Sequence, residues 1–169
     1  MRYNRLYKDN NFLTPTTYTQ TLSEYTETLR YEDIPADVVE RAKMIMLQTV
    51  GAALAAKGTP IAEKVCRMSE EANGGEGGAT SVWGTGKKMA AVNAALALGT
   101  MSDALDWEDC SWTGHPAAGV IPCAWLAAEE KHKSGKDLIT AIVAGYEVYQ
   151  RIACAVQPSD EIHITRQTD

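Results

Sequence analysis

The segment from Ser102 to Val120 carries the densest set of side chains in the sequence that could move protons. It reads SDALDWEDCSWTGHPAAGV and places four carboxylates, one thiol and one imidazole between positions 102 and 115. Imidazole exchanges protons near neutral pH, and a positioned carboxylate can orient it or exchange a proton itself. Acid–base groups of this kind gather at functional sites. The segment is therefore predicted to be a proton-transfer site.

The preceding residues predict where two of these acids point. Val92, Leu96 and Gly99 form one apolar stripe of a predicted helix. Continuing that stripe at helical spacing reaches Asp103 and then Asp106. Both carboxylates are therefore expected to point into protein, as the preceding turns of the stripe do.

The histidine of the segment is expected at the start of a helix. His115 directly precedes Pro116, and proline suits the first helical turn. The imidazole should then lie beside free backbone N–H groups, which favour an anion such as a substrate carboxylate. Any single residue here is explained as well by an exposed loop acid or a capping histidine. It is the combination that favours a site.

The elements that must position this segment are predicted to be almost entirely helical. Apolar residues recur at helical spacing through most of the chain, and Ser134 with Asp137 forms a capping box. The predicted fold class is therefore all-α, a helical bundle in a single domain of residues 1–169. Extended structure is expected only near Ala79–Trp83. The first expected helix is capped by Thr14 or Thr16 and ends near Arg30, and the second is capped by Asp33, with Pro35 in its first turn, and ends at about residue 57. The other expected helices cover 60–72, 87–106, 116–128 and 134–156.

Composition excludes several classes of function. Net charge is -6 and the pI is about 5.1, which disfavours a nucleic-acid or anionic-membrane surface. The four cysteines, Cys66, Cys110, Cys123 and Cys154, form no CxxC pair. A zinc site or a disulfide framework is therefore not expected, and a reducing cytoplasm is the predicted location. The N-terminus lacks the apolar core of a signal peptide.

Two of the predicted helices are apolar on every face, which is typical of helices buried in a large core. They cover 87–106 and 116–128. Such helices in a chain of 169 residues suggest that protein is missing around them. The chain is expected either to be the front part of a larger fold or to dimerise through these helices.

Three segments, in order, resemble the N-terminal part of the MmgE/PrpD family. They are IPADVVERAKMIMLQTVGAALAA, AAVNAALALGTMSDALDWEDCSWTGHPAAGVIPCAWLAAEE and SGKDLITAIVAGYEVYQRIA. The resemblance implies the N-terminal part of a large all-helical domain, with the family's separate lid domain absent from this chain. It also implies a homodimer, no organic cofactor, no metal, and small di- or tricarboxylates as substrates. The implied reaction is 2-methylcitrate dehydratase-like. A proton moves at a carbon beside a carboxylate, followed by loss of water, loss of CO₂ or reprotonation.

The resemblance also assigns roles to residues. Asp106 matches the family's first motif aspartate and His115 its motif histidine, and both are expected to be catalytic. Asp109 and Cys110 are expected to contact substrate, with Cys110 standing where the family commonly has threonine. His163 is the candidate for a second active-site histidine. The sequence departs from the family pattern at Asp103, Trp107 and Glu108, where many members have His, Phe and Asp.

Two alternatives remain open at the level of sequence. Asp103, Asp106 and Asp109 at spacing i, i+3 and i+6 could hold Mg²⁺ on a helix, because carboxylate oxygens suit this hard ion. Mg²⁺–diphosphate sites also need basic residues, which this stretch lacks, so no specific Mg²⁺ or Zn²⁺ site is expected. The other alternative is a catalytically silent helical dimerisation fragment.

Overall fold

The computed structural model describes residues 17–75, 77–111 and 114–156. These residues form six α-helices and one short hairpin, so the all-α prediction is confirmed. A 3₁₀ turn, η1 (Tyr31–Asp33), precedes the second helix. The helices are α1 (Tyr18–Thr28), α2 (Ala36–Ala56), α3 (Pro60–Ala72), α4 (Ala91–Asp103), α5 (Pro116–Glu130) and α6 (Gly135–Ala155). The hairpin pairs β1 (Thr80–Ser81) with β2 (Lys88–Met89), antiparallel, with Thr80 opposite Met89.

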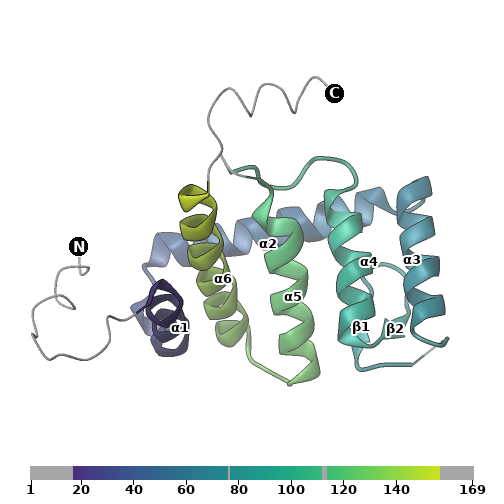
Figure 1. Ribbon diagram of the computed structural model, residues 1–169. Coiled ribbons are helices and arrows are strands. Elements are labelled where there is room, and N and C mark those ends of the chain that lie inside the picture. Colours follow the sequence, from purple (N-terminus) through teal and green to yellow (C-terminus); the bar gives the residue numbers. More distant parts are fainter. Residues whose placement is uncertain (1–16, 76, 112–113, 157–169) are drawn as a thin grey trace, which may run out of the picture.

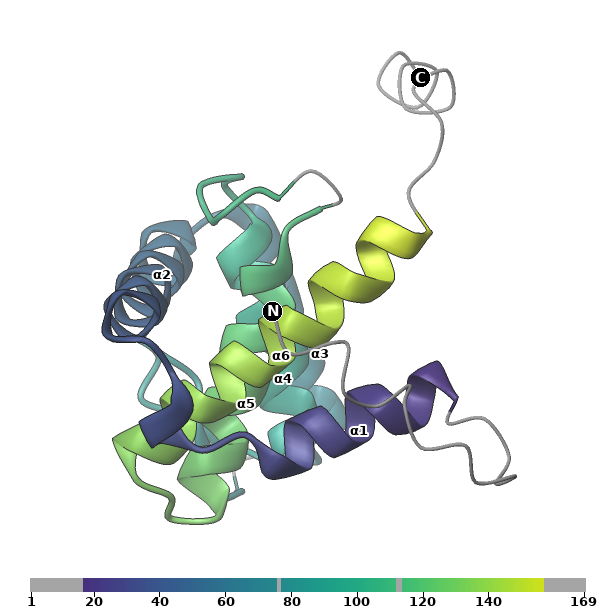
Figure 2. The same cartoon turned by 90° about the vertical axis from the view of Figure 1, so that its left-hand side faces the viewer.

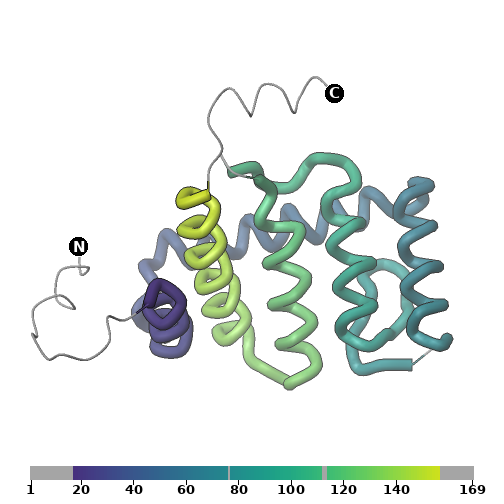
Figure 3. The backbone as a smooth tube through the Cα atoms, viewed as in Figure 1, coloured from purple at the N-terminus to yellow at the C-terminus, as the bar shows by residue number. Residues whose placement is uncertain are grey.

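The helices pack as a row with one helix laid across it. In Figure 1, α3, α4, α5 and α6 stand side by side, and α2 crosses behind them. Neighbours along the row pack against each other, and α2 packs against α4, α5 and α6. The backbone trace in Figure 3 shows successive helices of the row running in opposite directions. The view in Figure 2 places α6 between α2 and α1.

Helix boundaries follow local sequence chemistry at several positions. Ser134 and Asp137 form the predicted capping box at the start of α6, and Pro116 is the first residue of α5. The expected cap at Asp33 is wrong, because this residue closes the 3₁₀ turn and Pro35 occupies the N-cap position of α2. The helix expected from residue 87 begins at Ala91, since the preceding residues pair in the hairpin.

Helix α4 lies at the centre of the core, but only one of its faces is buried. Ala94, Leu98 and Met101 are almost completely buried, so this stripe contacts the helices on either side. The prediction that the stripe with Val92 and Leu96 points into protein is wrong. Val92 is 81% exposed and Leu96 is also exposed. One face of α4 therefore lies open, and the expectation that this face leads its acids into protein fails with it.

Small residues let the helices of the row approach closely. A Cβ built on Gly145 of α6 would lie 2.7 Å from Val120 Cγ1 of α5. A larger residue there would push the two helices apart, because a core packed at this density has no room for an added carbon.

No helix in the described part of the chain combines the length and the apolar character needed to cross a membrane.

The core assignment predicts the cost of deleting a side chain from α4. Leu98→Ala removes a fully buried side chain and should lower the free energy of unfolding by about 2–5 kcal/mol. Met68→Ala on α3 is the control, because Met68 is 51% exposed and should change stability by about 0.5 kcal/mol or less. Urea denaturation followed by circular dichroism measures both. Equal losses for the two variants would contradict the placement of the core.

Candidate functional site

The candidate site is the loop that joins α4 to α5. Helix α4 ends at Asp103, three residues earlier than predicted, and the chain turns there with Asp106 N–H donating to the Asp103 carbonyl (3.1 Å). Asp106 adopts a left-handed backbone conformation (φ 54°), which aspartate tolerates better than most residues. In Figure 1 this loop lies above the upper ends of α4 and α5, near the C-terminal end of α6.

Three helices hold the loop in place through hydrogen bonds. From α5, the Ala117 N–H donates to Asp109 Oδ1 (3.0 Å), and from α6 the Tyr146 hydroxyl donates to Asp109 Oδ2 (2.9 Å). From α2, the Gln48 side-chain amide donates to the Trp107 carbonyl (2.7 Å). The pKa of Tyr146 is raised strongly, first by burial and then by the charge and hydrogen bond of Asp109. Tyr146 therefore stays protonated and remains a donor to Asp109.

A close contact with α6 also fixes the end of the loop. Gly114 has φ +142°, and a Cβ built on it would lie 2.5 Å from the Tyr149 hydroxyl oxygen. Any side chain there would strain the backbone and collide with α6. The residue before the site histidine is thus fixed by a contact that only glycine allows.

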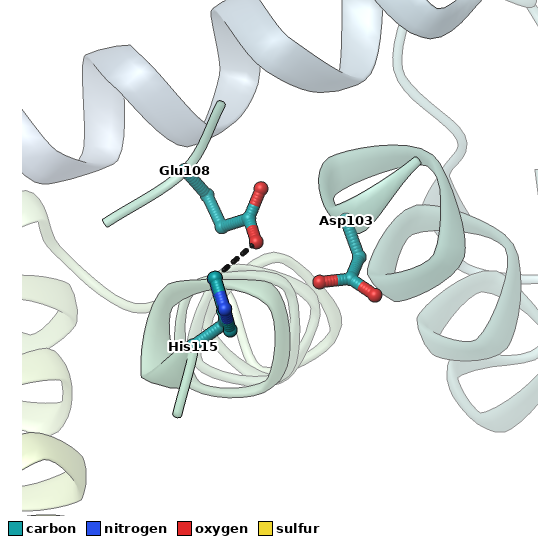
Figure 4. A group of neighbouring side chains, drawn as sticks. All are labelled: Asp103, Glu108 and His115. Atoms are coloured by element: carbon teal, nitrogen blue, oxygen red, sulfur yellow. Dashed lines mark ion pairs between the residues drawn. The ribbon is translucent and has the colours of Figure 1, made fainter. Parts of the chain in front are cut away.

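His115 and Glu108 form the tightest contact between ionisable groups in the loop. The His115 Nδ1 atom lies 2.8 Å from Glu108 Oε1, an ion-pair distance, as Figure 4 shows. The Glu108 side chain is 0% exposed, whereas that of His115 is 37% exposed. The contact lacks the alignment of a hydrogen bond, so neither Glu108 carboxylate oxygen has a hydrogen-bond partner among the described residues.

Burial is the main influence on Glu108. It raises the pKa of this carboxyl above its ordinary value of 4.5, and the nearby Asp103 carboxylate raises it further. The backbone N–H of Glu108 and the His115 ring act in the opposite direction. A buried acid under these influences has its ionisation coupled to the group that it contacts.

The structure brings only some of the predicted residues together. Asp106 Oδ1 lies 3.7 Å from His115 Nδ1, but its side chain is 84% exposed. Asp103 is exposed as well, so the prediction that these two acids point into protein is wrong. The reason is that helix α4 ends at Asp103 and its exposed stripe leads outward. The carboxylate that does point inward is Glu108.

The other predicted residues have different surroundings. His115 occupies the N-cap position of α5, as expected, but without a capping hydrogen bond from its side chain. The expected free N–H at this helix start is partly taken, because Pro116 has none and Ala117 donates to Asp109. Cys110 is exposed, and its thiol donates to the Ser111 carbonyl (3.4 Å). His163 lies outside the described residues.

A metal ion has one set of candidate ligands among the described residues. Donor atoms of Asp103, Glu108 and His115 lie within 4.8 Å of one another, and two carboxylates with one imidazole suit a divalent ion. The set proposed from spacing, Asp103 with Asp106 and Asp109, does not lie on a helix, and both Asp109 oxygens already accept hydrogen bonds. The helical Mg²⁺ alternative therefore loses its geometric basis.

Sequence reasoning missed the importance of Glu108. Glu108 stands among other acids in a loop, where no periodicity separates inward from outward positions. Its burial depends on contacts from other helices, such as that of Gln48 with the neighbouring Trp107. Only the tertiary structure distinguishes it from Asp106.

Comparison with known proteins gives a consistent set of relatives. Residues 20–168 match the MmgE/PrpD N-terminal domain. A cis-aconitate decarboxylase of Aspergillus terreus is 32% identical over 151 residues, covering 84% of this chain and 30% of the relative. The cis-aconitate decarboxylase-like protein oryM of Aspergillus oryzae is 28% identical, covering 84% of this chain and 31% of the relative. The chain thus spans about a third of the length of these curated relatives.

The raised pKa of Glu108 predicts a pH-dependent contribution to stability. Above pH 4.5 the carboxyl ionises freely in the unfolded chain but less readily in the folded one, so this group favours folding less as pH rises toward its folded-state pKa. Glu108→Gln should remove this dependence. The wild type minus variant difference in unfolding free energy should therefore fall as the pH rises from 4.5 toward the higher folded-state pKa of Glu108. The fall should be about 1.4 kcal/mol for every factor of ten between the ionisation constants of the folded and unfolded states.

Urea denaturation at a series of pH values measures that difference. Asp103 and His115 face the same carboxyl, so the pair of proteins should also be compared in a His115→Gln background, which removes the imidazole. A difference that is constant or rises with pH in both backgrounds would contradict the burial of an ionisable Glu108.

Proposed function

The chain belongs to the MmgE/PrpD family, and on that basis we propose that it carries the proton-transferring part of a lyase or isomerase site for small di- or tricarboxylates. The observation that carries this proposal is the pairing of a half-exposed imidazole, His115, with a fully buried carboxylate, Glu108. An imidazole held on one side by an acid and open on the other is the arrangement that general acid–base catalysis needs.

In the proposed reaction His115 moves the proton at a carbon beside a substrate carboxylate. Removal of that proton leaves an electron pair on the carbon and an imidazolium on His115. In a dehydration the electron pair expels a neighbouring hydroxyl, which takes the proton from the imidazolium and leaves as water. In an epimerisation a water molecule protonates the carbon on the other face, and the imidazolium returns its proton to the hydroxide that this leaves. In a decarboxylation the electron pair left behind by the departing CO₂ is instead protonated by the imidazolium. To Asp106, which is exposed and lies 3.7 Å from the imidazole, the proposal assigns the orientation of a substrate hydroxyl.

The remaining loop residues have supporting roles in this proposal. Cys110 is exposed in the same loop and is the candidate substrate contact. Asp109 acts mainly by tying the loop to α5 and α6, because both of its oxygens are engaged. His163 remains a predicted second histidine. No Mg²⁺ or Zn²⁺ is assigned to Asp103, Glu108 and His115, since the imidazole must be free to exchange protons.

The names of the relatives suggest which substrate to test first. Two are called cis-aconitate decarboxylase or a protein like it, so cis-aconitate is the first candidate, followed by 2-methylcitrate. Residues 102–120 contain no Lys or Arg, so a tricarboxylate bound here would need cationic groups from elsewhere in the complete protein. The four free cysteines are consistent with the cytoplasmic location that we propose.

His115 is expected to be essential for turnover. His115→Gln keeps polarity and approximate size but removes the proton-exchanging group, so it should lower kcat by about two to four orders of magnitude. His132→Gln is the matched control, because His132 lies at the far end of α5, beyond its last residue. Steady-state kinetics of the complete gene product on citrate-like and aconitate-like acids, with thermal melts, measures both.

Two outcomes would contradict the proposal. Wild-type turnover by His115→Gln would place the proton transfer elsewhere. A wild type inactive on every such acid would favour the silent helical module instead.

Self-association is the second part of the proposal. Met44, Leu47 and Leu54 are exposed apolar residues on one side of α2, and Val92 and Leu96 are exposed on α4. Large apolar side chains that are exposed side by side on one helix are typical of an interface. We therefore propose that the protein forms a homodimer, with α2 in its interface.

The interface on α2 predicts a charge-sensitive association. Leu47→Lys should shift the protein toward monomer at micromolar concentration, because a lysine would be buried against an apolar partner. Thr26→Lys adds the same charge on the exposed side of α1 and should leave the mass unchanged. Light scattering coupled to size exclusion reports the mass. A wild type that stays monomeric, or equal behaviour of both variants, would rule out this interface.

A further inference from the structure

The two nitrogen atoms of the His115 ring have different surroundings. Glu108 and Asp106 both approach Nδ1, at 2.8 Å and 3.7 Å. The other ring nitrogen, Nε2, has no polar partner among the described residues. Figure 4 shows the Glu108 carboxylate directed at the His115 ring, with Asp103 to the side.

We propose that Glu108 is the positioning residue for His115. Its buried carboxylate holds the ring through Nδ1–H and leaves Nε2 as the nitrogen that exchanges protons with the substrate. The part played by Nε2 rests on the proposed function, whereas the orientation of the ring stands on the geometry alone. The tautomer of an imidazole is set by the partner of the nitrogen that does not react.

Burial makes Glu108 the strong partner. A buried carboxylate without hydrogen bonds is costly, so the fold favours any arrangement that brings an N–H against it. The His115 Nδ1 atom lies 2.8 Å from Glu108 Oε1, so an N–H on this nitrogen can face the buried carboxylate. Removing the ring would leave Glu108 unpaired inside the protein, and removing Glu108 would leave the ring free to rotate.

Exposure makes Asp106 the weak partner. Its side chain is 84% exposed and lies farther from the ring, so water screens the interaction. A screened carboxylate has little influence on the orientation of a ring. The two carboxylates therefore have different roles in this proposal: Glu108 orients the imidazole, and Asp106 faces the substrate.

The proton position can be measured on the 169-residue chain without any substrate. Long-range ¹H–¹⁵N spectra at pH about 9, where imidazoles are neutral, show which ring nitrogen carries the proton. The signals of His115 are identified by their absence in His115→Gln. The expected wild-type result is the Nδ1–H tautomer, opposite to the Nε2–H form that free imidazole side chains favour.

Three variants distinguish the effect of Glu108 on the His115 tautomer from that of Asp106. Glu108→Gln should convert His115 toward the Nε2–H tautomer, and Glu108→Asp, which keeps the charge, should retain part of the Nδ1–H form. Asp106→Asn is the matched control and should leave the tautomer unchanged. A wild type in the Nε2–H form, or a change caused by Asp106→Asn but not by Glu108→Gln, would overturn the assignment. The wild-type spectrum decides even if a Glu108 variant does not fold.

A divalent ion is tested in the same spectra. Stoichiometric, saturable loss or shift of the His115 signals on adding Zn²⁺ at micromolar concentration would overturn the positioning role and favour a metal bound by Asp103, Glu108 and His115. Unchanged signals support the positioning role.

Kinetics of the complete gene product complete the test. Glu108→Gln should lower kcat by about ten- to a hundredfold, the usual cost of removing the group that orients a functional imidazole. KM should change much less, and Glu108→Asp should recover part of the loss. If His115→Gln turned over normally while the tautomer followed Glu108, the proposed function would fail and the positioning of the ring would stand. Wild-type kcat in Glu108→Gln would overturn the positioning role.

Discussion

The burial of one carboxylate is the constraint on which the arrangement of this site depends. Glu108 lies inside the protein with no hydrogen-bond partner among the described residues, and its Oε1 atom lies 2.8 Å from His115 Nδ1. Leaving a buried polar group unsatisfied costs about 1–3 kcal/mol, and more for a charged one. The loop can tolerate that cost only if its backbone is held firmly. Hydrogen bonds from α2, α5 and α6, together with the contact of Gly114 with Tyr149, provide that support.

The helix row explains why the supports meet at one place. Because α4 and α5 are neighbours that run in opposite directions, the end of α4 and the start of α5 lie together on the same edge of the row. The crossing helix α2 and the C-terminal part of α6 both reach that edge, which allows Gln48 and Tyr146 to contact the same loop. A histidine on a loop supported from three sides has the fixed position that proton transfer requires.

Local chemistry predicts much of the fold, and tertiary contacts decide the rest. The α3 helix matches its predicted range because Thr59 caps it and Pro60 opens it, and α6 follows from its capping box. The place of His115 is predictable because Pro116 marks a helix start. The orientation of Asp103 and Asp106 is not, because the helical period ends with α4 and cannot be extended beyond it. Within a loop no period exists, so the burial of Glu108 cannot be read from its neighbours in sequence.

The central claim is that Glu108 acts through His115, and a double-mutant cycle on kcat/KM tests it most directly. The cycle compares wild type, Glu108→Gln, His115→Gln and the double variant of the complete gene product on cis-aconitate or the best substrate found. Groups that work as a unit show strongly non-additive losses. The account predicts that the double variant is no slower than His115→Gln alone. Losses that multiply, so that Glu108→Gln slows the His115→Gln protein by its full single-variant factor, would show that the two residues act independently and would contradict the account.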